Sequence, residues 1–230
     1  NRVFQSNYEM GSTFKPITAI MGYDLGILDL KMKFDVTKKY LNISDHDKFK
    51  DDGIYDIEKI IVESSNIGTA QLATKIGKQN QINFFNKIGF YDRIEFENKE
   101  AVYPLGNKNN WGPLETATIG FGHGFSVTPL HLVKAYATLS NNGIVVNPTL
   151  KFKEITDKKQ ILNNKNSSKF FLNLLNSVVL KTNYTGPRVK IDGYSIGGKT
   201  GTSELINPLG GYYKDRNLTS FIGIFPINDP

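Results

Sequence analysis

Residues 11–16 read Gly11-Ser12-Thr13-Phe14-Lys15-Pro16, and this run predicts the start of a helix. Proline is tolerated only in the first turn of a helix, so the helix begins close to Ser12. Residues three apart are neighbours on one helix face, so the Ser12 hydroxyl and the Lys15 amine can come within hydrogen-bond reach. Further along, apolar residues at spacings of three and four predict one buried face: Phe14, Ile17, Met21, Leu25 and Leu28.

Ser12 and Lys15 together indicate a serine nucleophile beside a lysine base. A hydroxyl at its ordinary pKa is unreactive and an ammonium group cannot accept its proton, so Lys15 must be at least transiently neutral. Burial and a second nearby cation would both lower the pKa of Lys15, and Lys199 is the candidate for that cation. Backbone N–H groups at the helix start would point at whatever Ser12 attacks.

A second group, Ser64-Ser65-Asn66, lies between two helical patterns. One pattern runs from residue 57 to about residue 63, and the other covers residues 67–76 and stops at Gly77. Residues two apart cannot face the same way within one helix, so we expect Ser64 and Asn66 on a loop. From there the hydroxyl can relay a proton, and the amide can hold a substrate carbonyl or fix Lys15.

A third group, Lys199-Thr200-Gly201-Thr202, lies in a strand-like stretch. Residues 194–203 and 219–225 predict neighbouring antiparallel strands joined by a loop at 207–211. Alternation along a strand sends Lys199 and Gly201 to one face and Thr200 and Thr202 to the other. Glycine at 201 would let the backbone of an extended peptide approach closely.

The rest of the chain reads as mainly helical, which makes the predicted fold α+β. We expect helices at 80–88 and 168–180 and a third that begins at Thr128-Pro129. Two weak strands are expected at 144–147 and 151–155, and residues 91–125 read as long loops. The inner face of the helix after Thr128 is expected to carry Leu132, Val133, Tyr136 and Leu139.

Composition excludes several classes of protein. The 230 residues are 39% hydrophobic and 12% aromatic, which excludes disorder and fibres, and the formal charge of +6 permits an anionic partner without requiring one. Without cysteine there is no disulfide and no thiolate metal site. No apolar stretch approaches the roughly 20 residues that span a bilayer. The chain opens without an initiating methionine, so we interpret it as a piece of a longer protein.

Neither a metal nor a nucleic-acid site is expected. His46, His123 and His131 have no ligand-like spacing to one another, and we expect His123 to be a wall or packing residue of the Gly-rich loop 120–124. Lysines at 31–59 and 151–169 alternate with acids and asparagines, which indicates solvated surface rather than nucleic-acid binding.

The three groups, in this order, occur together in penicillin-interacting serine enzymes. The sequence resembles the transpeptidase domain of class B penicillin-binding proteins, and most closely its cell-division branch. Asparagine at 66 favours that branch, whereas Met10 stands where proline is common. The resemblance rests on 1–2, 8–16, 63–68, 120–124, 127–130, 136–139, 198–202 and 220–223.

The resemblance implies a serine β-lactamase/transpeptidase-like fold, an antiparallel sheet flanked by helices, here truncated at both ends. Residues 1–230 would be a partial transpeptidase domain without the membrane anchor, the pedestal domain and the outer sheet strands. We therefore expect residues 1–230 to fold poorly alone, because strand 219–225 would have an unpaired edge.

As mechanism, the resemblance implies that Ser12 attacks the penultimate D-Ala carbonyl of a peptidoglycan stem peptide and that Lys15 takes its proton. Ser64 would pass that proton to the departing D-Ala, and Asn66 would hold the donor peptide. The remaining implied roles are carboxylate binding by Lys199, Thr200 and Thr202, close peptide approach at Gly201, and an oxyanion hole from the N–H groups of Ser12 and Thr202.

The resemblance implies no cofactor. It implies β-lactam antibiotics as inhibitors, a glycan polymerase and other division proteins as partners, and a catalytic domain on the periplasmic side of a bacterial inner membrane. Two alternatives stay open. A β-lactamase or penicillin-sensing receptor shares the serine–lysine and Lys-Thr-Gly groups, although Glu95 and Glu97 lack the expected neighbours for activating a water. An inactive division scaffold is the other.

Overall fold

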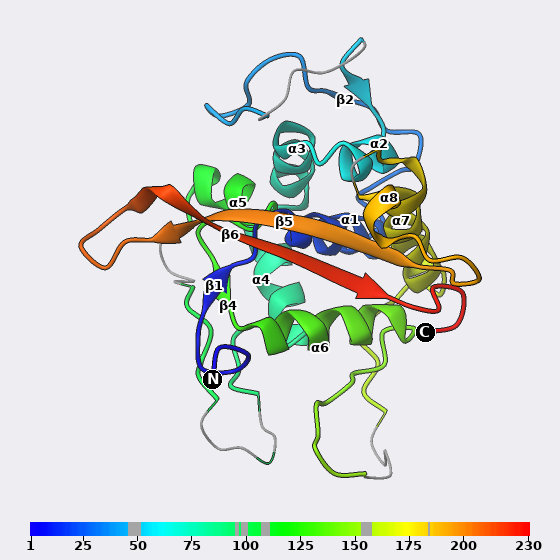
Figure 1. Ribbon diagram of the computed structural model, residues 1–230. Coiled ribbons are helices and arrows are strands. Elements are labelled where there is room, and N and C mark those ends of the chain that lie inside the picture. The colour runs from blue at the N-terminus through cyan, green and yellow to red at the C-terminus, as the bar shows by residue number, and fades with distance from the viewer. Residues whose placement is uncertain (46–51, 95–96, 98–100, 107–110, 153–157, 184) are drawn as a thin grey trace.

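The computed structural model describes residues 1–45, 52–94, 97, 101–106, 111–152, 158–183 and 185–230 (Figure 1). Its helices are α1 (Lys15–Asp24), α2 (Ile57–Val62), α3 (Asn66–Ile76), α4 (Lys78–Lys87), α5 (Pro113–Ile119), α6 (Pro129–Ser140), α7 (Ser167–Lys181) and α8 (Gly186–Val189), with a 3-10 turn, η1 (Gly11–Phe14), directly before α1. The strands pair antiparallel as β1 (Tyr8–Glu9) with β4 (Ser126–Val127), β2 (Phe34–Asp35) with β3 (Ile54–Tyr55), and β5 (Gly197–Ile206) with β6 (Tyr212–Ile224). The expected α+β class is confirmed.

The long hairpin β5–β6 runs across the helices, with α2, α3 and α8 above it and α6 below it in Figure 1. Helix α7 packs against β5, α1 and α6, and η1 packs against β5. Two segments almost 200 residues apart in the sequence, η1 and β5, are therefore neighbours in the fold.

Helix α1 is central because nearly all of its residues are buried. Before it, Phe14 joins an aromatic cluster with Phe85, Phe90 and Phe125, and its ring centroid lies 5.4 Å from that of Phe90. Each such ring removes about 150–250 Å² of surface from water. The turn that carries Ser12 is thus anchored on the hydrophobic core.

Gly201 marks the place where β5 touches η1. A Cβ atom at this position would lie 2.6 Å from the Met10 carbonyl oxygen and 2.9 Å from Thr13 Cγ2. Ordinary contacts of a Cβ atom begin near 3.4 Å, so only glycine fits without displacing the turn. Gly11, which has a φ of 52°, makes the reciprocal close approach to Thr202.

Most predicted elements are confirmed. Helices expected at 57–63, 67–76, 80–88 and 168–180 correspond to α2, α3, α4 and α7, and Thr128 caps α6 by accepting a hydrogen bond from the His131 N–H. The two late strands pair antiparallel as expected. In β5, Lys199 and Gly201 face inward and Thr200 and Thr202 face outward, as the alternation predicts.

Some local predictions were wrong. Leu25 is 37% exposed because α1 ends at Asp24, and Val133 is 54% exposed because it lies on the outer face of α6. Helix α5 was expected to be loop. At 144–147 a single bridge joins Ile144 to Gln160 in place of a strand. The other weak strand, 151–155, lies largely outside the described residues.

In the described residues, the helices are all too short or too polar to traverse a lipid bilayer.

Candidate active site

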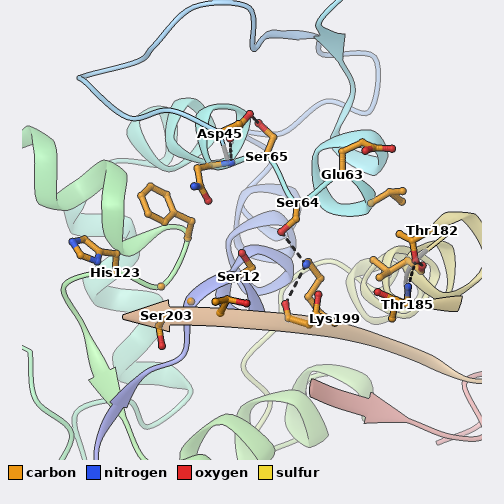
Figure 2. A pocket seen from close by; sticks show the side chains of 18 of the residues that line it. Ser12, Asp45, Glu63, Ser64, Ser65, His123, Thr182, Thr185, Lys199 and Ser203 are labelled. Carbon is orange, nitrogen blue, oxygen red and sulfur yellow. Dashed lines mark hydrogen bonds between the residues drawn. The ribbon is translucent and has the colours of Figure 1, made fainter. Parts of the chain in front are cut away.

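A cleft of about 620 Å³ runs between η1, the start of α3 and strand β5. Figure 2 shows Ser12, Ser64 and Lys199 gathered in its middle, with His123 and Ser203 toward one end and Thr182 and Thr185 toward the other. Of the residues predicted for the site, those that line the cleft are Ser12, Ser64, Asn66, Lys199, Thr200 and Thr202.

Ser12 is partly exposed to this cleft, on the turn η1. The turn is held in place by two hydrogen bonds at its neighbour Thr13. The Thr13 hydroxyl donates to the Met10 carbonyl at 2.8 Å, and the Tyr136 hydroxyl donates to the Thr13 carbonyl at 2.7 Å. Pro16 lies in the first turn of α1, as predicted, so the helix starts immediately behind the serine.

Lys15 is the first residue of α1 and is fully buried. Its Nζ atom donates to the Ser64 backbone carbonyl and, at 3.1 Å, to the Ser64 hydroxyl. Among the described residues, no hydrogen bond joins it to the Ser12 hydroxyl, which differs from the direct contact that the helical spacing allows. Burial lowers the pKa of Lys15 well below its ordinary value, and the charge of Lys199 lowers it further, as the sequence predicted.

Ser64 lies between α2 and α3 with a φ of 57°. A non-glycine residue in this left-handed region costs about 1–3 kcal/mol, and such strain gathers at functional sites. Its hydroxyl oxygen accepts hydrogen bonds from Lys15 Nζ at 3.1 Å and from Lys199 Nζ at 3.0 Å. One oxygen therefore joins two lysines that come from opposite ends of the sequence.

Lys199 is buried on the inner face of β5, and besides Ser64 its Nζ donates to the Thr200 carbonyl at 3.2 Å (Figure 2). Burial lowers its pKa to about 8. Thr200 and Thr202 face the cleft. Gly201 does not line the cleft, because it packs against η1. The close approach that glycine permits at this position is to the chain's own turn, and the predicted approach of a bound peptide to Gly201 stays a prediction.

Asn66 begins α3 rather than lying on the preceding loop, and its side-chain amide donates to the Ser44 carbonyl at 3.3 Å. Beside it, Asp45 accepts a hydrogen bond from the Ser65 hydroxyl at 2.6 Å and one from the Ile67 N–H at 3.1 Å. Asp45 thus secures the start of α3, where a negative charge is favoured. Sequence reasoning missed it because residues 29–56 carry no sustained period.

A second missed residue, Glu9, lies at the end of the cleft near His123. Its buried carboxylate forms an ion pair with His123 Nδ1 at 3.0 Å and accepts hydrogen bonds from Gly124 N–H at 2.9 Å and from the Tyr212 hydroxyl at 2.8 Å. The only sequence signal for Glu9 is its position within residues 8–16, one of the stretches on which the family resemblance rests. His123 lines the cleft and is thus a wall residue, as expected.

The described residues hold no cluster of three or more potential metal-ligating side chains. Glu97 lies on the surface, where its carboxylate accepts hydrogen bonds from the Thr149 hydroxyl at 2.6 Å and the Leu150 N–H at 2.9 Å, and it does not line the cleft. Glu95 and His46 lie outside the described residues.

Comparison with known proteins agrees with this geometry. The family described as "Penicillin binding protein transpeptidase domain" matches residues 1–230. The chain is 31% identical over 236 residues to a probable peptidoglycan D,D-transpeptidase FtsI of Caulobacter vibrioides, covering 100% of this chain and 40% of that protein. It is 30% identical over 246 residues to stage V sporulation protein D of Bacillus subtilis, covering 98% of this chain and 37% of that protein.

Among solved structures, the transpeptidase domain of penicillin-binding protein 3 from Burkholderia pseudomallei superimposes with a TM-score of 0.90 at 26% identity. That match covers 100% of this chain and 70% of the other. The chain spans about two fifths of the length of the two curated relatives described above.

Proposed function

The chain belongs to the penicillin-binding protein transpeptidase domain family, and from this membership we propose that the protein is a serine-type peptidoglycan D,D-transpeptidase. The observation that carries the proposal is the convergence of two buried lysines on the Ser64 hydroxyl, in the cleft that Ser12 lines. A neutral lysine is what a serine nucleophile needs as a base, and burial together with a neighbouring cation favours the neutral form of Lys15.

In the proposed reaction, Ser12 Oγ attacks the carbonyl carbon of the penultimate D-Ala of a stem peptide. Lys15 accepts the hydroxyl proton, directly or through Ser64. The tetrahedral intermediate collapses with cleavage of the C–N bond, and Ser64 passes the proton to the departing D-Ala amine. An amine of a neighbouring peptidoglycan strand then attacks the ester carbonyl carbon, and the C–O bond to Ser12 breaks. The proton that the amine loses restores the Ser12 hydroxyl, and a peptide cross-link forms.

The other residues would bind and orient the substrate. Lys199, Thr200 and Thr202 would hold the terminal carboxylate, and Asn66 the amide of the donor peptide. The backbone N–H groups of Ser12 and Thr202 would donate to the developing oxyanion, and removing one such donor typically costs about 3–4 kcal/mol of transition-state stabilisation. Gly201 would act indirectly, by allowing Thr202 to lie close to η1.

β-Lactams mimic the D-Ala-D-Ala end of the stem peptide, so we expect them to acylate Ser12 and to be released slowly. The similarity to FtsI supports a role in septal cell-wall synthesis, on the periplasmic side of the inner membrane, together with a glycan polymerase and other division proteins. Residues 1–230 would then be one part of a longer, membrane-anchored protein.

Labelling with a fluorescent penicillin tests the proposal. The protein containing residues 1–230 should be labelled covalently, and Ser12→Ala should abolish the label. Ser140→Ala, at the end of α6 and outside the cleft, is the matched control and should label normally. Labelling that survives in Ser12→Ala would refute the proposed nucleophile, and no labelling of the unsubstituted protein would favour an inactive scaffold.

Nitrocefin separates transfer from hydrolysis. A transpeptidase should consume about one equivalent in a burst and then stop, because water does not readily release the acyl group. Steady turnover of many equivalents would identify a β-lactamase instead.

A further inference from the structure

Glu9 connects four segments that surround the nucleophile. It belongs to β1 and lies three residues before Ser12. Its carboxylate contacts His123 and Gly124 in the loop 120–124 and Tyr212 at the start of β6, and its backbone carbonyl accepts a hydrogen bond from the Ser203 hydroxyl of β5 at 2.6 Å. Glu9 is only 5% exposed, and burying a charged carboxylate is costly unless hydrogen bonds and an opposite charge compensate. The contacts to His123, Gly124 and Tyr212 supply that compensation.

The loop that Glu9 holds also touches the nucleophile's turn directly. The Gly11 N–H donates to the Gly122 carbonyl at 3.2 Å. A Cβ atom at position 122 would clash with the Gly11 backbone, so the two segments are in van der Waals contact. Movement of the loop would therefore be transmitted to Gly11, the residue next to Ser12.

His123 is the member of this cluster that reaches the solvent. Its side chain is 42% exposed, and it lines the cleft while its Nδ1 atom faces Glu9. The titratable and charged groups that face it are Glu9 from β1, Glu204 from β5 and Tyr212 from β6, whose ring centroid lies 5.1 Å from that of the imidazole. Both carboxylates favour the protonated imidazole.

We propose that Glu9 and His123 form a positioning pair, whose ion pair fixes the loop 120–124 and the β5–β6 hairpin against the turn that carries Ser12. This inference rests on the proposed function, since it assigns these residues to the alignment of the nucleophile. Neither residue takes part in the bond-making steps. Their effect is to hold Ser12 at the distance from Thr202 that acylation requires.

The ion pair should persist only within a window of pH. Its hydrogen bond to Glu9 raises the pKa of His123, although burial opposes this, so the pair is present below the ordinary histidine value and is lost as pH rises through the raised value. Burial alone would raise the pKa of Glu9, but hydrogen bonds from His123 and Tyr212 outweigh it and lower the value. The pair is therefore lost on the acid side only below the ordinary range for glutamate.

The test is the rate of acylation by a fluorescent penicillin, measured from about pH 5.5 to about pH 9. At the acid end of this pH range, we expect His123→Gln to acylate about tenfold more slowly than the unsubstituted protein. This is smaller than the cost of about 10²-fold that a misplacement of 1 Å can have. The ratio of the two rates should fall toward one as His123 loses its proton. His123→Arg, which stays charged, should keep the faster rate at high pH.

Two further measurements separate positioning from mere stability. His131→Gln is the matched control. His131 is buried, its two ring nitrogens hydrogen-bond to the Thr128 hydroxyl and the Asp92 carbonyl, and it does not line the cleft. It should lower the melting temperature while its rate ratio to the unsubstituted protein stays constant with pH. NMR titration of the imidazole should give His123 a raised pKa that falls toward the ordinary value in Glu9→Gln.

A rate ratio for His123→Gln that does not vary with pH would overturn the inference, as would an imidazole pKa that Glu9→Gln leaves unchanged. Both outcomes leave the proposed function intact. Absence of Ser12-dependent labelling in the unsubstituted protein would instead overturn the proposed function, and this inference with it.

Discussion

The contact between β5 and η1 can be tested by adding one methyl group at Gly201. A Cβ atom there would lie 2.6 Å from the Met10 carbonyl oxygen, and ordinary contact begins near 3.4 Å, so the strand and the turn must separate by about 0.8 Å. The Ser220 hydroxyl, also at 2.6 Å, is a side chain and can rotate, but the Met10 carbonyl is backbone and cannot swing aside. Overpacking of this kind typically costs about 1–3 kcal/mol of unfolding free energy.

The same displacement falls between Ser12 and Thr202, and misplacement by about 1 Å can cost 10²-fold in rate. We therefore expect Gly201→Ala to slow penicillin acylation by about 10- to 100-fold and to lower the melting temperature. The matched control is Gly223→Ala on the partner strand, where a Cβ atom would meet the Phe221 ring at 3.0 Å. That ring is 44% exposed and can move away, so the control should change the rate only a few-fold.

The assay is stopped-flow acylation alongside thermal unfolding for both variants. Gly201→Ala that acylates at the normal rate and melts at the normal temperature would refute the reasoning, because it would mean that β5 does not pack on the turn. Equal losses in both variants would also count against it, since the effect would then belong to the hairpin in general.

Two further perturbations probe the charges of the fold. Lys199→Met removes the positive charge that helps lower the pKa of Lys15, so the pKa of Lys15 should rise and the increase in acylation rate with pH should occur at higher pH. If the pH at which the rate increases does not change, Lys199 is excluded as that cation. At pH 7 the same variant should be more stable by about 1–3 kcal/mol in thermal or urea unfolding. A buried lysine whose pKa is lowered from 10.5 to about 8 destabilises the fold increasingly as pH falls through that interval, and the full penalty is present below about pH 8. Asp24→Ala should lower the free energy of unfolding by about 3 kcal/mol, because the buried Asp24 carboxylate accepts hydrogen bonds from Asn163, Asn164 and Ser167 at the start of α7. Urea unfolding should show this loss, while acylation per folded molecule stays normal. Unchanged stability would contradict the structural role given to Asp24.

Local patterns were enough to predict the parts of the site that depend on secondary structure. Proline at 16 located the start of α1 behind Ser12, and alternation along β5 separated inward Lys199 from outward Thr200 and Thr202. These predictions succeed because each depends on residues a few positions apart.

What could not be predicted depends on contacts between distant segments. Spacing allowed Lys15 to bond to Ser12, whereas the structure turns its amine to Ser64, which comes from another pair of helices. Asp45 and Glu9 have no periodic signal, and their partners lie 20 to more than 200 residues away. The inward orientation of Gly201 followed from alternation, but its contact with Met10 did not.

The central claim is that Ser12 is the nucleophile, and the most direct test is mass spectrometry of the penicillin-treated protein. Digestion should yield one modified peptide, with the penicilloyl group on Ser12, and the modification should be lost when Lys15 is replaced by methionine. A penicilloyl group on Ser64 or on any other residue, with the Ser12 peptide unmodified, would contradict the account.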